Sequence, residues 1–150
     1  MAKFVFKLEA VLRERAQTEK RRQRELAAVQ ARFSRISAAL DANHARLRDT
    51  TNIVRANRVG RLDTRLLAEG ARFAFAIREK ISGLRAELHA IRPELARAQE
   101  ALVEAAKQRK VLEKLRETQK LQWTAAQEKK EAQALDEIGA AIGRYLGQDI

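Results

Sequence analysis

The fold is decided by residues 77–105, which read IREKISGLRAELHAIRPELARAQEALVEA. Apolar side chains recur along this stretch at alternating intervals of four and three residues: Ile77, Ile81, Leu84, Leu88, Ile91, Leu95, Ala98, Leu102 and Ala105. This average spacing is typical of a helix that packs along another helix in a coiled coil. The stretch therefore predicts a long helix whose apolar seam faces a second helix.

A matching seam lies in the first third of the chain. Every seventh residue from the fifth position onward, with one acidic exception, is apolar: Val5, Leu12, Glu19, Leu26, Phe33, Leu40, Leu47 and Val54. Leu8, Val29 and Ile36 each follow a member of that series by three residues, as the second seam position of a heptad does. Together the two seams predict an all-α fold, an antiparallel two-helix coiled-coil hairpin with a C-terminal helical overhang.

Turn signals set the expected boundaries within one domain, residues 1–150. The first helix is expected over about 3–57, the turn over about 58–63 and the second helix over about 64–140. Gly60 suits the left-handed conformation that ends a helix, and Asp63 or Thr64 suits the cap of the next one. Gly70 and Pro93 are expected to kink the second helix without ending it, because the seam passes Pro93 without changing phase.

A chain folded at residue 60 places position i opposite about 120 − i in an antiparallel hairpin. Each arm would be ~80 Å long at 1.5 Å per residue. The seam has polar gaps that act as weak points or as register markers: Arg15, Glu19, Arg22 and Arg109. Residues 119–150 would then extend beyond the first helix as an unpaired, partly apolar tail that invites a partner: Trp123, Leu135, Ile138, Ile142, Tyr145 and Leu146.

Composition bounds the functional class. Charged residues make up 34% of the chain and aromatic residues 5%, which favours long solvated helices over a thick globular core. Cysteine is absent, so neither disulfides nor thiolate metal sites are expected. No uncharged apolar run approaches the ~20 residues that span a bilayer, and the first residues lack the apolar centre of a signal peptide. We therefore expect a soluble, cytoplasmic protein.

The net charge of +11 is unevenly distributed. Residues 1–60 hold 14 Lys and Arg against 6 Asp and Glu, whereas residues 119–150 hold 4 against 5. Such a balance favours acidic partners. The basic stretch over residues 20–24 leaves a nucleic-acid-binding coiled coil open as an alternative, although no recognition module or interleaved aromatic residue accompanies the stretch.

No residue pattern indicates catalysis, a cofactor or a metal site. His44 and His89 would lie at different heights of the hairpin, so they cannot share a metal ion. Ser37, Asp41 and His44 share a helical face, but the carboxylate rather than the imidazole occupies the middle position, which does not suit a catalytic triad. Gly139, Gly143 and Gly147 form a small-residue face that suits either close helix packing or a fraying end. A non-enzymatic protein without cofactors is expected.

Three segments, in order along the chain, resemble the FliJ family. Residues 4–8, FVFKL, resemble its opening aromatic-basic element, and residues 109–116, RKVLEKLR, resemble an internal charged segment. Residues 131–138, EAQALDEI, resemble its closing motif. The resemblance spans the chain and implies a component of the bacterial flagellar type III export apparatus, similar to the central stalk of a rotary ATPase.

The resemblance also implies partners and contact residues. The joined ends of the hairpin would enter the pore of the hexameric flagellar export ATPase, and the candidate residues there are Phe4, Phe6, Leu8, Arg15, Arg22, Leu112, Leu115, Trp123 and Leu135. The region toward the turn would contact the cytoplasmic domain of the export gate, and the candidates there are Leu40, His44, Leu47, Phe73 and Ile77. Export chaperones are further implied partners, and the implied location is the cytoplasmic side of the inner-membrane export apparatus at the flagellar base.

Two further alternatives remain open at this point. One is the equivalent stalk of a virulence-type injectisome, which belongs to the same mechanical class. The other is a homodimeric scaffold that pairs through the tail helix. Neighbouring genes would separate the first from the flagellar protein, and the mass in solution would test the second.

Overall fold

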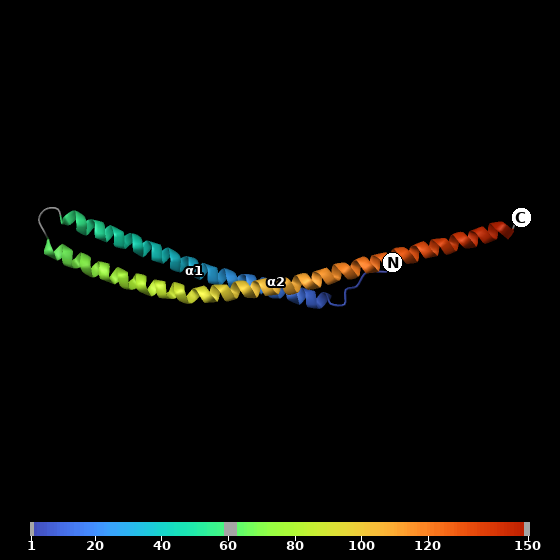
Figure 1. Ribbon diagram of the computed structural model, residues 1–150, viewed down its shortest axis with the longest axis horizontal. Helices are drawn as coiled ribbons and strands as arrows, with labels where there is room; N and C mark the ends of the chain where they lie inside the picture. Colours follow the sequence, from blue (N-terminus) through green and yellow to red (C-terminus); the bar gives the residue numbers. More distant parts are fainter. Residues whose placement is uncertain (1, 59–62, 149–150) are drawn as a thin grey trace. The chain divides into compact units, whose positions relative to one another are not determined.

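The computed structural model describes residues 2–58 and 63–148, which form two long helices (Figure 1). Helix α1 spans Glu9–Asn57 and helix α2 spans Thr64–Gln148. No strand occurs in the described ranges. The predicted all-α helical hairpin is therefore confirmed, and α2 extends eight residues beyond its expected end.

The first helix starts later than expected, at Glu9 instead of near Lys3. Phe4 is half-buried and Phe6 is buried, whereas Val5 between them is 76% exposed. This alternation is the period of an extended segment, because successive side chains of an extended chain point to opposite sides. The seven-residue count therefore fails at Val5, and the helix begins only where Phe6 and Leu8 accept backbone hydrogen bonds from Glu9 and Leu12.

The second helix begins with a capping side chain. The Oδ1 atom of Asp63 accepts hydrogen bonds from the backbone N–H groups of Arg65 and Leu66, at 3.1 and 3.4 Å. These are two of the donors that the first turn of a helix leaves unpaired. Asp63 therefore provides the predicted cap. Gly60, the predicted helix end, lies outside the described residues.

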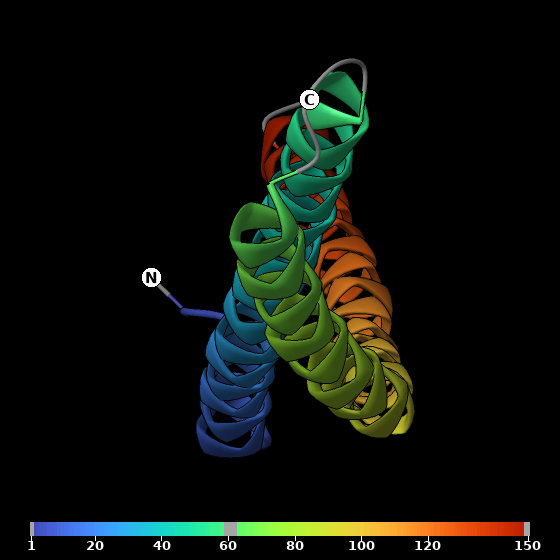
Figure 2. The same cartoon turned by 90° about the vertical axis from the view of Figure 1, so that its left-hand side faces the viewer.

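Residue contacts group into two compact units. The terminal unit contains Met1–Glu19 and Ala105–Ile150, and the turn unit contains Lys20–Glu104. Within each unit a segment of α1 lies antiparallel to a segment of α2, and Figure 2 shows the two helices of the turn unit side by side. The expectation of a single domain stays a prediction.

The predicted seam forms the core of each unit. All nine apolar seam positions of α2 are buried or half-buried. Among the described residues, Ile77, Ile81 and Ile91 are buried in the turn unit, and Leu12 and Ala105 are buried in the terminal unit together with Phe6, which lies outside the predicted seam. Two narrow helices can cover only this stripe, so most other side chains remain exposed.

The register of the two helices differs from the expected one. Glu9 pairs with Arg116 and Arg32 pairs with Glu94, five to six residues further along α2 than a fold centred on residue 60 predicts. Near the turn, Val54 lies against Gly70, and this contact is centred on residue 62. The shifted centre accounts for most of the difference.

Neither Gly70 nor Pro93 interrupts α2, which is continuous through both. Pro93 has no backbone N–H, so the carbonyl of His89 lacks its usual helical donor. The seam residues Ile91 and Leu95 on either side of Pro93 remain packed, which holds the helix together across this position.

Candidate partner-binding surfaces

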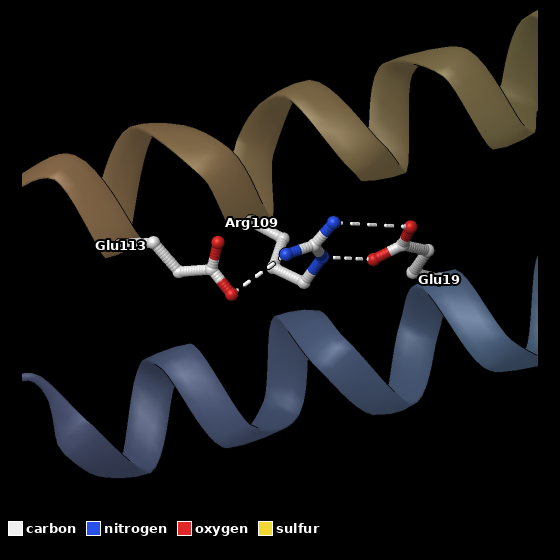
Figure 3. A network of polar contacts seen from close by, with 3 residues as sticks. All are labelled: Glu19, Arg109 and Glu113. Atoms are coloured by element: carbon white, nitrogen blue, oxygen red, sulfur yellow. Dashed lines mark hydrogen bonds and ion pairs between the residues drawn. The ribbon is translucent and has the colours of Figure 1, made fainter.

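A charged network joins the two helices inside the terminal unit (Figure 3). The guanidinium of Arg109 donates hydrogen bonds from Nε to Glu19 of α1 and from Nη1 to Glu113 one turn further along α2, the latter at 2.6 Å. The side chains of Arg109 and Glu19 are only 24% and 14% exposed. The hydrogen bond that Arg109 donates to Glu19, and then the one that it donates to Glu113, raise the pKa of Arg109 above its ordinary value. The polar seam gaps at Glu19 and Arg109 therefore complement each other.

The extended N-terminal segment covers part of α2 within the same unit. The ring of Phe4 packs against Trp123, with ring centroids 6.0 Å apart and tilted by 54°. Trp123 was expected on an unpaired tail, so this placement was wrong. Residues 2–6 are not helical, and a chain that is not coiled into a helix can advance more than twice as far per residue, which allows Phe4 to reach Trp123.

The candidate residues for the ATPase contact differ in accessibility. Phe6 is buried, so its side chain is packed inside the terminal unit, whereas Leu8 and Leu115 are exposed and Leu112 is half-buried. Arg15 donates a hydrogen bond to Gln108 across the two helices. Arg22 belongs to the turn unit, where it pairs with Glu25 at 2.9 Å.

The C-terminal part of α2 carries apolar side chains that no described residue covers. Every described residue from 128 onward is exposed, and Figure 1 shows this end of α2 without a neighbouring segment. The large apolar side chains there are 54–72% exposed: Leu135, Ile138, Ile142, Tyr145 and Leu146. These five residues are called the tail face below. Large apolar side chains exposed together on one helix end suit contact with a partner.

The candidate gate residues differ in exposure and in the hollows that they line. Ile77 is 2% exposed and lies inside the seam, and Leu40 is half-buried. Phe73 is 43% exposed, and the guanidinium carbon of Arg46 lies 5.4 Å from the centre of its ring. His44 and Leu47 line hollows that Phe73 does not line.

Phe73 belongs to a small apolar hollow near the turn. Its volume is about 280 Å³, and its lining includes Ile53 and Val54 of α1 and Leu66 and Gly70 of α2. Ile53, Leu66 and Phe73 are all exposed at its rim. We call this hollow the turn groove. It can hold one or two apolar side chains of a partner.

The turn unit has a further surface, which the sequence patterns did not predict. Three adjoining hollows of the turn unit are lined by five arginines from both helices: Arg48, Arg55, Arg58, Arg78 and Arg85. We call them together the basic groove. Arginines seven residues apart on each helix were the available signal, since such residues lie on one helical face.

The residues that the sequence suggested for a triad or a metal site are not brought together in the described ranges. Ser37, Asp41 and His44 are not joined to one another by hydrogen bonds, and no group of three or more potential metal ligands occurs in the ranges that the structure describes. No described helix is long and apolar enough to cross a membrane. The described residues instead provide three kinds of feature. They are the charged network of Glu19, Arg109 and Glu113, which we call the charged lock, the exposed tail face, and the turn and basic grooves.

These features define a helical hairpin protein that offers surfaces to partners. A comparison with family profiles matches residues 4–144 to the family described as "Flagellar FliJ protein". The match covers nearly the whole chain, so the chain belongs to the FliJ family, a structural component of the flagellar type III export apparatus. No curated protein and no solved structure matches the chain.

Proposed function

We propose that this chain is the central stalk of the hexameric flagellar export ATPase and links that ATPase to the export gate. The observation that carries the proposal is the tail face on a chain of the FliJ family. Five large apolar side chains exposed on one helix end require a covering surface, and the lining of a ring-shaped ATPase would supply one.

The terminal unit suits this role because its two helices are fixed against each other. Arg109 holds Glu19 of the other helix, and Arg116 holds Glu9 at 3.3 Å. The two ends of the hairpin would therefore enter the ring as one body. The terminal unit would keep one orientation there, and it would stabilise or stimulate the ATPase. In this proposal the turn groove, with Phe73 and Ile53, contacts the cytoplasmic domain of the gate, and export chaperones bind elsewhere on the helices.

The stalk role places the chain at the cytoplasmic side of the inner-membrane export apparatus. The family match supports a flagellar apparatus over the injectisome alternative. No finding favours a homodimeric scaffold.

The test uses substitutions on the tail face. Leu135→Gln combined with Ile142→Gln should abolish stimulation of the hexameric flagellar export ATPase of the same organism, while helicity by circular dichroism stays unchanged. The matched control combines Lys129→Gln and Glu131→Gln, two exposed residues of the same helix, and should keep full stimulation.

Removal of residues 128–150 should have the same effect as the two tail-face substitutions, since these residues add no buried side chain in the described range. A truncated chain that stimulates the ATPase fully would refute insertion through the tail face.

A further inference from the structure

The basic groove is a continuous surface along both helices of the turn unit. Its three hollows have volumes of about 420, 670 and 350 Å³. The first two share Thr51 and Arg55, the last two share His44 and Leu47, and the first and third share Arg78. Because each hollow shares lining residues with the other two, they form one elongated groove.

The charge of the groove is not neutralised by the described parts of the chain. Asp41 is the one acidic residue among the described lining residues, against five arginines. None of the five arginines forms an ion pair with a described residue. In another hollow of the same unit, by contrast, Arg32 pairs with Glu94 at 2.8 Å. The groove therefore concentrates positive charge that a partner can neutralise.

The arginines repeat with the period of a coiled coil. Arg48 and Arg55 are seven residues apart on α1, and Arg78 and Arg85 are seven apart on α2. Seven residues are two helical turns, about 10.5 Å. In coiled coils, charged residues that flank the apolar seam at this repeat determine which partner helix binds. A third helix lying in the groove would pass an arginine of each row once in every two turns.

Between the arginines, the groove is lined by both apolar and uncharged polar side chains, and the apolar ones come from both helices. Leu47 belongs to α1, and Leu67, Ala71, Ala74 and Ile81 belong to α2. We propose that the basic groove binds an acidic amphipathic helix of a partner protein, whose apolar stripe packs between the helices and whose Glu or Asp side chains pair with the two arginine rows. Arginine suits this task because its planar guanidinium binds carboxylates through two parallel hydrogen bonds.

The lining favours a protein helix over a nucleic acid. No Phe, Tyr or Trp lines the described groove, although single-stranded nucleic acids are usually held by stacking on aromatic rings. The groove lies along both helices and places apolar side chains between its arginines, whereas a membrane surface requires cations that project onto a plane. This inference does not depend on the proposed contacts with the ATPase or the gate.

The experiment measures binding of a synthetic three-heptad helical peptide to the full chain by fluorescence anisotropy at physiological salt. The peptide carries Leu and Ala on one stripe and Glu at the flanking positions, and a second peptide carries Gln in place of each Glu. Binding of the Glu peptide should be at least about tenfold tighter than binding of the Gln peptide.

Substitutions locate the binding surface. Arg78→Glu combined with Arg85→Glu should weaken binding of the Glu peptide at least about tenfold. The matched control combines Arg72→Glu and Lys80→Glu, which change the net charge equally at exposed positions of α2 outside the groove. This control should bind within about twofold of the unchanged chain, because exposed charges at a distance are screened by salt. Arg48→Glu with Arg55→Glu tests the other row if the first variant loses helicity.

Three results would overturn the proposal. One is no difference between the Glu and Gln peptides, and another is an equal loss in the groove variant and its control. The third is tighter binding of a single-stranded oligonucleotide or of phosphatidylglycerol vesicles that also depends on Arg78 and Arg85, which would assign the groove to nucleic acid or lipid.

Discussion

Gly70 of α2 lies directly against Val54 of α1: a β carbon added to Gly70 would lie only 2.7 Å from the Cγ2 atom of Val54. The valine side chain is branched at Cβ and has few alternative rotamers, so it cannot easily move away. Gly70, which was expected to kink α2, therefore allows the two helices to approach closely next to the turn.

This contact predicts opposite effects for two glycine substitutions. Gly70→Ala gains about 1 kcal/mol of helix propensity but overpacks the contact at a cost of roughly 1–3 kcal/mol, so the chain should lose about 1 kcal/mol of stability. Gly83→Ala should instead gain about 1 kcal/mol, because no atom lies within 4 Å of its added Cβ. Urea unfolding measures both.

Val54→Ala provides the control for this explanation. With the branched side chain removed, Gly70→Ala should become stabilising by about 1 kcal/mol, as at Gly83. If Gly70→Ala had the same effect with and without Val54, the close contact would not be its cause.

A second prediction concerns the charged lock of the terminal unit. Glu19→Arg alone and Arg109→Glu alone should each lower the melting temperature by several degrees, because each places two like charges together between the helices. The combined exchange should recover part of the loss, but not all of it, since Glu113 would then face another carboxylate. Circular dichroism melts measure the coupling, and a combined loss equal to the sum of the single losses would contradict a direct pair.

The raised pKa of Arg109 also determines how the contribution of this charged lock to stability depends on pH. A group whose folded pKa is raised stabilises the fold below its unfolded pKa, and the effect is lost as pH rises through the folded pKa. For an arginine this window lies in strongly alkaline solution. The contribution of Arg109 should therefore be equal at neutral and mildly alkaline pH.

The sequence could predict those parts of the fold that depend on a repeat. The seam from Ile77 to Ala105 determines which side of α2 is covered, and this follows from apolar spacing alone. The extended segment around Phe4 and Phe6 was not predicted, because a period of two and a period of seven cannot be distinguished over so few residues. The basic groove escaped prediction because it depends on the lateral faces of both helices together, which requires their register.

A third prediction follows from the proline inside α2. Pro93 is exposed, so replacing it with alanine removes little packing while it restores the N–H donor to the His89 carbonyl. Pro93→Ala should stabilise the chain by up to about 3 kcal/mol. Ala96→Ser, at an exposed position one turn away, serves as a control and should change stability by less than about 0.5 kcal/mol. A destabilised Pro93→Ala chain would mean that the ring of the proline makes a needed contact.

The contact between Phe4 and Trp123 predicts a spectroscopic result. Trp123 is the only tryptophan in the chain and is half-buried against Phe4, so the tryptophan fluorescence comes from one ring that contacts the N-terminal segment. Phe4→Ala should shift its emission to longer wavelength, because water replaces the phenyl ring. Val5→Ala, which changes an exposed neighbour in the same segment, should leave the emission unchanged. An unchanged spectrum in Phe4→Ala would show that the segment does not cover α2 in solution.

The last prediction tests which side of the turn unit contacts the export gate. Phe73 lines the turn groove, whereas Phe75, two residues away and 64% exposed, does not. Phe73→Ala should weaken binding to the cytoplasmic domain of the gate by about tenfold, since loss of one exposed aromatic anchor commonly costs more than ~1 kcal/mol in an interface. Phe75→Ala is the matched control and should bind as the unchanged chain does. If Arg78→Glu with Arg85→Glu weakened gate binding while Phe73→Ala did not, the gate would occupy the basic groove, and the turn groove would have to serve another partner.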